Sequence, residues 1–341
     1  MQTVSDIIEE LLRSDEPSVR WKVRVNVLGE DPRSDSIRRL QRQIRSSTRV
    51  TALLSERTPD GTIPVGPYQK WSGAHWVLPT LADIGYPPGD ETLRPLPEQV
   101  LNCWLSPRHL ESVQTIEGRA RRCASQESNA LYALLTLGLA DERADELAAN
   151  LRKWQWPDGG WNCDKKPQAV HSSFHETTIG VRALALHGRL RRCQPSLDAA
   201  RGAAEIFLKR SLFRRLRDGA VMNKRFLMLH YPPYWHYDVL FGLKALAEAE
   251  LIGDPRCREA LDLLESKRLA DGGFPAEGRY YRLDVQRKKT GRWPSDRSLV
   301  DWGGTSKRRM NQWVTADALF VLVAAGRMDP QDLHRKPASR R

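Results

Sequence analysis

The amino-acid sequence predicts an all-α fold in which polar and apolar helices pair around glycine-rich turns. Residues 151–189 show the unit most clearly: a polar helix runs into Trp154, a Pro-Asp-Gly-Gly-Trp turn follows, and a more apolar helix comes after a loop. Pro157 cannot continue the first helix, and Gly159 and Gly160 permit backbone angles closed to other residues. Two helices joined by such a turn form an αα-hairpin.

The unit recurs in degenerate form at residues 55–84 and 266–322. Each copy has a helix end, an Asp-Gly turn, a segment with aromatic or histidine residues and an apolar helix, and the last copy carries a long polar insertion. Internal repeats of helix pairs are typical of a solenoid or of a closed ring of hairpins. The sequence therefore predicts one repeat-built domain over 1–328, followed by a basic, disordered tail at 329–341.

Caps and breakers bound the first six expected helices. Ser5 is placed to cap the first helix, Pro17 opens the second and Gly29 ends it, whereas the third is long and basic. An aromatic-rich segment leads into the fourth helix, and a Pro-Pro-Gly sequence at 87–89 breaks the chain after it. The expected helices lie at 4–13, 17–28, 35–55, before Gly85, 97–105 and 128–139.

The same signals bound the remaining six helices. Asp141 is placed to cap the seventh helix, Pro195 begins the ninth, and a Gly-Asp-Pro turn at 253–255 precedes the eleventh. No stretch has a convincing strand pattern. The expected helices lie at 141–154, 172–188, 195–212, 239–251, 256–268 and 312–325.

These twelve helices alternate in character, because the odd-numbered ones are amphipathic and charged and the even-numbered ones are mostly apolar. A helix that is apolar all round is buried on every side, and a helix with one polar face lies at the surface. The alternation therefore predicts six inner and six outer helices, which is the arrangement of an (α/α)6 toroid, or barrel.

Charge and cysteine content narrow the functional classes. The 54 Lys and Arg residues outnumber 42 Asp and Glu and give a net charge of +12, but they are scattered and accompany no nucleic-acid-binding motif. We therefore expect no nucleic-acid partner, whereas an anionic small molecule suits the charge. The five cysteines are widely spaced and form no Cys-x-x-Cys pattern, which favours reduced thiols in the cytoplasm. The chain starts with an acidic amphipathic segment unlike a signal peptide, and no apolar run is long enough to span a membrane, so we expect no transmembrane segment. The sequence gives no indication of the oligomeric state.

Two turns resemble motifs of a known superfamily. Residues 155–161, Gln-Trp-Pro-Asp-Gly-Gly-Trp, resemble the QW motif of squalene and hopene cyclases, and 271–274, Asp-Gly-Gly-Phe, resemble a turn of protein prenyltransferase β subunits. The resemblance implies the α–α toroid of the terpenoid cyclases and protein prenyltransferases. The Asp-x-Asp-Asp acid motif of class II cyclases is absent, residues 161–164 lack the Asp-x-Cys spacing of prenyltransferase zinc ligands, and 311–325 contain no histidine. The resemblance therefore extends to the fold and to neither reaction.

Function is expected at the end of the barrel that receives the long loops, where the inner helices also present their N-termini. Free N–H groups and helix dipoles favour anions there. The candidates for acid–base catalysis are His175, Glu176, His236 and Asp238. The candidates for ligand binding, by stacking, hydrogen bonds or charge, are Trp71, His75, Glu127, Trp161, His171, Tyr234, Trp235, Arg309, Trp313 and Asp317. The competing interpretation is that the acids cap helices and the aromatics pack at the rim.

The sequence leaves open whether a metal is bound and which of three functional classes applies. The spacing His171-x3-His175 with Glu176 is that of two helical metal ligands and a base, but a third ligand is not obvious, the nearest being Cys163 and Asp164. We therefore predict no cofactor and keep a divalent metal as the alternative. The classes are an enzyme acting on an anionic or isoprenoid-like small molecule, a carbohydrate-active hydrolase or lyase, and a non-catalytic ligand-binding or interaction protein. Fold alone does not decide among them.

Overall fold

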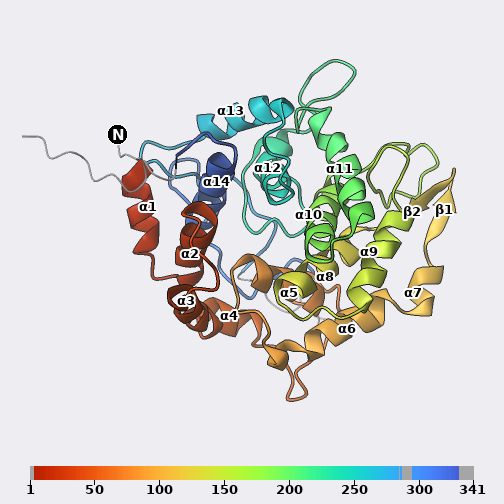
Figure 1. Cartoon of the computed structure of the whole chain (residues 1–341), viewed down its shortest axis with the longest axis horizontal. Helices are drawn as coiled ribbons and strands as arrows, with labels where there is room; N and C mark the ends of the chain where they lie inside the picture. The colour runs from red at the N-terminus through yellow and green to blue at the C-terminus, as the bar shows by residue number, and fades with distance from the viewer. Residues whose placement is uncertain (1–3, 284, 286–293, 330–341) are drawn as a thin grey trace, which may run out of the picture.

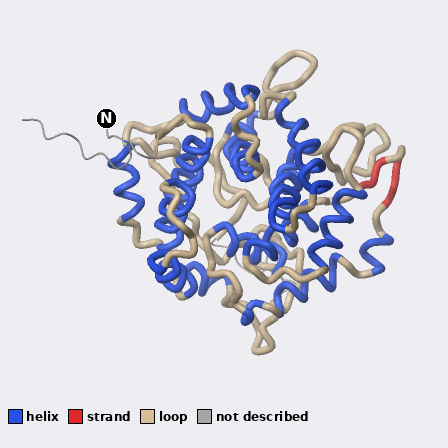
Figure 2. Tube along the Cα trace, in the orientation of Figure 1, coloured by secondary structure: helices blue, strands red, loops and turns tan. Residues whose placement is uncertain are grey.

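A computed structural model describes residues 4–283, 285 and 294–329, and within them the fold is all-α (Figures 1 and 2). The described residues form fourteen α-helices, a few short 3-10 and π-helical turns and one two-stranded sheet. None of these helices combines the length and hydropathy needed to cross a membrane. The tail predicted at 329–341 lies outside the described residues except for Asp329.

The long third helix predicted at 35–55 is divided in two. The side chain of Ser47 accepts a hydrogen bond from the N–H of Val50, so a new N-cap interrupts the basic stretch. The second predicted helix continues into a π-helical turn instead of remaining α-helical to its end. The N-terminal elements are α1 (Val4–Leu12), α2 (Pro17–Trp21), η1 (Lys22–Val27), α3 (Asp35–Arg45) and α4 (Thr48–Leu53).

A small antiparallel hairpin lies in a region where no strand is predicted. Strand β1 (Gln114–Ile116) pairs with β2 (Arg119–Arg121) through a turn in which Glu117 and Gly118 have positive φ, 51° and 66°. Two consecutive positive φ angles are those of a type I′ turn, whose twist suits a two-residue hairpin. The helices around it are α5 (Ala74–Asp83), η2 (Glu91–Leu93), α6 (Pro95–Trp104), α7 (Pro107–Glu111), α8 (Ser125–Thr136) and α9 (Arg143–Lys153).

The C-terminal half holds the longest helix, α10, which begins two residues after the start predicted near Ser172. The elements here are α10 (Phe174–Leu190), α11 (Gln194–Leu208), η3 (Lys224–Leu227), α12 (Val239–Glu248), η4 (Pro255–Cys257), α13 (Arg258–Ser266) and α14 (Gln312–Ala324).

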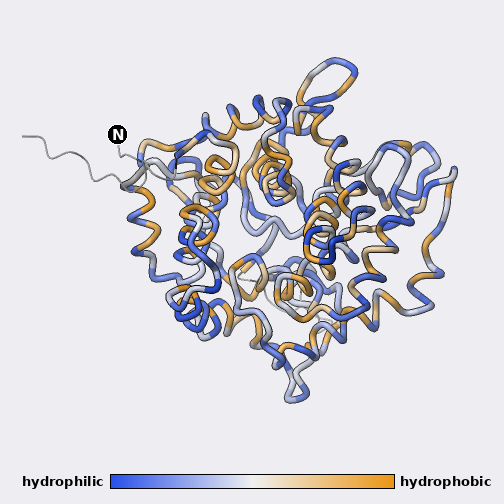
Figure 3. Tube along the Cα trace, viewed as in Figure 1, coloured by the Kyte–Doolittle hydropathy of each residue, from blue (hydrophilic) through white to orange (hydrophobic). Residues whose placement is uncertain are grey.

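The apolar helices pack on one another in sequence order: α5 on α8, α8 on α10, α10 on α12, α12 on α14, and α14 on η1. Lys22 of η1 forms an ion pair with Asp83 of α5, so the series of contacts returns to its first helix. The more amphipathic helices α6, α9, α11 and α13 pack against these helices and lie toward the periphery of Figure 1. In Figure 3, α12 is mostly hydrophobic, whereas α3 mixes hydrophobic and hydrophilic positions. The buried apolar residues therefore lie where these two sets of helices pack on one another.

The three predicted turns share one pattern of backbone hydrogen bonds. In each, the last residue before the turn donates its N–H to the carbonyl of the residue four positions later. The glycine three positions after that first residue donates its own N–H to the first residue's carbonyl. Those glycines, Gly61, Gly159 and Gly272, have φ of 84°, 105° and 84°. After two of the turns, the N–H of the next aromatic residue donates to a threonine on the following inner helix: Trp161 to Thr177 at 3.2 Å and Phe274 to Thr315 at 2.9 Å. The repeat seen in the sequence is therefore a repeat of structure.

We expect Gly159→Ala to lower the free energy of unfolding by roughly 1–3 kcal/mol or more, since it strains the backbone and meets a neighbour. A Cβ at Gly159 would lie 2.2 Å from the carbonyl oxygen of Gly202. Gly219→Ala is the matched control, because Gly219 also has positive φ, 68°, but its Cβ would face open space. Urea denaturation should show a clearly larger loss for the first variant. Equal losses would mean that the contact between the turn and α11 has little energetic weight.

Candidate functional site

The loops ahead of α5 and α12 bring five of the predicted residues into one aromatic cluster. Trp71 stacks on Tyr234 with ring centroids 4.1 Å apart, and His236 stacks on Trp235 at 4.6 Å. His175, in the first turn of α10, meets the Trp235 ring edge-on at 4.9 Å. The N-terminal ends of three inner helices therefore supply one group of stacked rings.

Burial sets the protonation of the two histidines in this cluster. It lowers the pKa of His236 to about 2 and that of His175 to about 4, so both imidazoles are neutral at neutral pH. Nδ1 of His175 accepts the backbone N–H of Tyr237 at 2.8 Å. Nδ1 of His236 is buried and has no hydrogen-bond partner among the described residues. Both rings are thus suited to hydrogen bonding and packing more than to donating protons at neutral pH.

Asp238, a candidate acid or base, is committed to the fold. One of its oxygens accepts the N–H of Phe241 at 2.7 Å and caps α12, and the other lies 2.6 Å from Nδ1 of His230. Its exposed fraction is 1%. Since both oxygens are occupied, Asp238 has the capping role that is the alternative to catalysis.

Four other candidates lie away from the aromatic cluster. His171 is exposed and precedes the first residue of α10, so it cannot share a helix face with His175 as the metal hypothesis required. Arg309 is exposed on a loop. Trp161 and Trp313 are 0% and 3% exposed and pack inside the core. These positions are explained by folding or by solvent contact without a ligand.

His75 is enclosed between the aromatic cluster and the outer helix α6. Its Nδ1 accepts the indole N–H of Trp104 at 3.3 Å, and its Nε2 lies 3.5 Å from the amide nitrogen of Asn129. Burial lowers the pKa of His75 to about 3, so the ring is neutral. His75 therefore helps to position Trp104, which lines the neighbouring cavity.

That cavity, of about 530 Å³, lies between the loop ahead of α5, the β1–β2 hairpin and the start of α8. Its volume falls within the range of about 300–1,000 Å³ typical of small-molecule sites. We call it the cationic pocket. It is lined by the aromatic residues Tyr68 and Trp104, the cations Arg121, Arg122 and Lys165, and the thiols Cys123 and Cys163.

Two of the three cations in this pocket lack a carboxylate partner. Arg122 is neutralised by Glu127, which is 0% exposed and accepts from the Arg122 Nε at 3.0 and 3.1 Å. Arg121 donates instead to the backbone carbonyls of Ala169 and Ile116, and no described carboxylate is within ion-pair distance of it or of Lys165. The pocket is therefore electropositive, and Glu127, predicted to bind ligand, holds Arg122 in place.

No protein-family model matches the chain, and no curated protein matches it. The chemistry of the site itself is therefore what bears on function.

A thiol–carboxylate group lies at the edge of the cationic pocket. Ligand atoms of Cys123, Cys163 and Glu176 lie within 4.8 Å of one another, and no other such group of three is found among the described residues. Interaction with the neighbouring thiol raises the pKa of Cys123 and lowers that of Cys163. Burial raises the pKa of Glu176 above its usual value, although the N–H of Ser125 donates to its Oε2 at 2.7 Å. Glu176 is thus the one predicted catalytic acid that lies next to two thiols.

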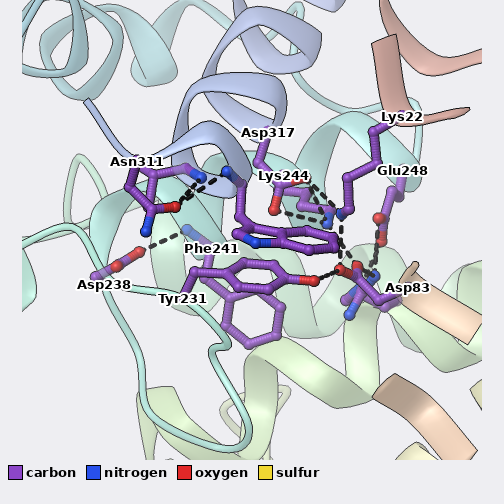
Figure 4. A network of polar contacts seen from close by, with 12 residues as sticks. Lys22, Asp83, Tyr231, Asp238, Phe241, Lys244, Glu248, Asn311 and Asp317 are labelled. Atoms are coloured by element: carbon purple, nitrogen blue, oxygen red, sulfur yellow. Dashed lines mark hydrogen bonds and ion pairs between the residues drawn. The ribbon is translucent and has the colours of Figure 1, made fainter. Parts of the chain in front are cut away.

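A network of six charged side chains inside the helix core was not predicted from the sequence (Figure 4). Lys22 lies 2.7 Å from Asp83 and 2.8 Å from Asp317, and Lys244 bonds to the same two carboxylates at 2.6 and 3.0 Å. The network also includes the pair Arg182–Glu248 and the hydroxyl of Tyr231, which donates to Asp83 at 2.9 Å.

Three cations and three carboxylates balance one another in this network. Burial would raise the pKa of Asp83, but Lys22, Lys244 and Arg182 outweigh it and hold that pKa well below its usual value. Asp317, predicted to bind ligand, is therefore an ion-pair partner. Asp83 and Arg182 line two further cavities, of about 30 and 190 Å³. Both are smaller than the cationic pocket.

Proposed function

We propose that this protein binds a small anionic molecule with an apolar portion, of the isoprenoid-like kind, in the cationic pocket. The observation that carries the proposal is one cavity that combines two cations, Arg121 and Lys165, with the rings of Tyr68 and Trp104. Neither cation has a carboxylate partner among the residues that the structure describes. Charge-assisted hydrogen bonds would hold the anionic group, and the rings would cover the apolar part.

We also propose that the helices close into an (α/α)6 toroid. The inner set would be α2 with η1, α5, α8, α10, α12 and α14, and the outer set α1, α3, α6, α9, α11 and α13. The sequence-order packing and the return contact between Lys22 and Asp83 support this arrangement. In such a ring the cationic pocket would lie at the N-terminal end of α8, where the helix dipole favours an anion.

The pocket's lining argues against the carbohydrate alternative. A glycosidase needs two carboxyl groups on either side of the scissile bond. No Asp or Glu from the described residues lines the pocket, Glu127 is bound to Arg122, and Asp238 caps a helix. A polar ligand without negative charge would leave Arg121 and Lys165 unpaired, so an anion suits the site better.

The test is equilibrium binding of farnesyl diphosphate, inorganic pyrophosphate and farnesol by calorimetry. We expect the diphosphate ester to bind best, because it alone offers both charge and hydrocarbon. Lys165→Gln and Arg121→Gln should each weaken its binding roughly 10–100-fold, the effect of losing one hydrogen bond to a charged group. Arg217→Gln is the control, since Arg217 lies on a separate loop and is 77% exposed.

Two results would contradict the proposal. One is equal binding of farnesol and farnesyl diphosphate, which would make the cations irrelevant. The other is an affinity that Lys165→Gln leaves unchanged, because Lys165 is exposed and its loss should not disturb folding. Higher salt should also weaken binding, since Lys165 is accessible to screening ions.

A further inference from the structure

The end of strand β2 and the segment after the repeat turn at 155–161 lie side by side next to the cationic pocket. Arg121 and Asn162 form a β-bridge, and the N–H of Arg122 donates to the carbonyl of Asn162 at 3.2 Å. The residues that follow, Cys123 and Cys163, are therefore fixed next to each other by backbone pairing. Cys123 leads into α8, and Cys163 comes two residues after Trp161 of the repeat turn.

The third member, Glu176, is fixed by the start of a neighbouring helix. Its Oε2 accepts the N–H of Ser125 at the beginning of α8, and its Oε1 lies 3.9 Å from Sγ of Cys163. The residue is 5% exposed, and no described cation forms an ion pair with it. A buried carboxylate is normally paired or bound to a metal. Apart from the Cys163 thiol at 3.9 Å, Oε1 has no described partner, and a carboxylate oxygen of Glu176 lies within 4.8 Å of both sulfurs.

We propose that Cys123, Cys163 and Glu176 bind a zinc ion whose fourth coordination position opens into the cationic pocket. Two sulfurs and one carboxylate oxygen are ligands that zinc accepts, and soft thiolates disfavour magnesium and calcium. Tetrahedral bonds of about 2.3 Å to sulfur and 2.0–2.2 Å to oxygen place neighbouring ligand atoms about 3.5–3.8 Å apart. The 3.9 Å between Cys163 and Glu176 needs only a small adjustment to reach that spacing.

The placement of the thiols explains why the fourth position would face the pocket. Both cysteines line the cavity, whereas Glu176 is buried and is absent from its wall. Three protein ligands with one open position are typical of zinc sites that act on a ligand or a water molecule. On binding, the ion replaces the thiol protons, which pass to solvent. The hydrogen bond from Ser125 would orient Glu176, as outer partners of metal ligands do.

This inference deepens the proposed function, since the ion would meet the ligand's polar end, but its test is independent of ligand binding. The protein is equilibrated with zinc in reducing buffer, desalted and analysed by mass spectrometry of its metal content. We expect about one zinc per chain, and little or none in Cys123→Ser and Cys163→Ser. Cys193→Ser is the control, because Cys193 stands at the N-cap position of α11 and does not line the pocket.

Cobalt substitution provides the second readout, because thiolate ligands give a strong near-ultraviolet charge-transfer band. The wild type should show the band intensity of two thiolates and each serine variant that of one or none. Glu176→Gln should keep both thiolates and lower metal affinity by at least the roughly 10–100-fold seen when an outer partner is lost.

Three outcomes would overturn the metal site. These are no bound zinc in reducing buffer, zinc retained by both serine variants, and a Cys123–Cys163 disulfide that persists under reduction in place of metal. If zinc binds but farnesyl diphosphate does not, the metal site stands and the proposed function fails. If the diphosphate binds to metal-free protein as tightly as to zinc-loaded protein, the ion plays no part in ligand binding.

Discussion

Replacing Asp83 by asparagine is expected to lower the free energy of unfolding by about 3–5 kcal/mol, the usual effect of breaking a buried ion pair. Asp83 accepts from Lys22, Lys244 and the hydroxyl of Tyr231, and its side chain is 11% exposed. Without its charge, three cations would face two carboxylates in the core. Urea denaturation measures the loss.

Asp262→Asn is the matched control, because Asp262 pairs with Arg327 and its side chain is 56% exposed. A surface ion pair contributes about 1 kcal/mol or less, so this variant should be nearly as stable as the wild type. Equal effects of the two substitutions would show that the buried network does not stabilise the fold.

The contribution of Asp83 should also depend on pH in a defined direction. Its pKa is lower in the folded protein than in the unfolded chain, because the three cations outweigh burial. Its stabilisation is therefore complete above about pH 4, the unfolded value, and is lost as pH falls through the lower folded value. The stabilities of wild type and Asp83→Asn should converge below pH 4. A difference that stays constant into strong acid would contradict this explanation.

Trp161→Ala is expected to have an effect of similar size, about 3–5 kcal/mol, because it empties a large space in the core. Trp161 is fully buried, its indole N–H donates to the carbonyl of Leu151 at 2.9 Å, and its ring packs on Gly180 of α10. The residue therefore joins the repeat turn to two helices, which accounts for its place in the motif without a ligand.

Trp235→Ala provides the comparison for this prediction. Trp235 belongs to the aromatic cluster, is only partly buried, and its indole nitrogen has no hydrogen-bond partner among the described residues. We expect a clearly smaller loss of stability than for Trp161→Ala, measured by urea denaturation. A larger loss for Trp235→Ala would make the cluster a structural centre and weaken its interpretation as part of a site.

The helices were predictable because their signals are local. Alternating apolar and amphipathic stretches mark them, and proline, glycine and capping residues mark their ends. The small hairpin escaped prediction because three-residue strands leave almost no periodic pattern, and its signal was the Glu117-Gly118 pair alone. The division of the third helix depended on a single cap at Ser47.

The site was only partly predictable, because its contacts join distant residues. Helix N-termini indicated where Trp71, His175 and Trp235 would gather. The ionic network pairs Lys22 with Asp317, 295 positions apart, and its only sequence signal is charge within apolar helices. Cys123 and Cys163 are brought together by a β-bridge that no spacing rule foresees. Tertiary pairing of this kind needs the structure.

The most direct test of the proposed function is a crystal structure of the protein with farnesyl diphosphate. We expect phosphate oxygens within hydrogen-bonding distance of Arg121 or Lys165, with the hydrocarbon against Tyr68 or Trp104. An empty cationic pocket at saturating ligand would contradict it. So would a ligand in the cavity of about 190 Å³ that Tyr132 and Phe320 line.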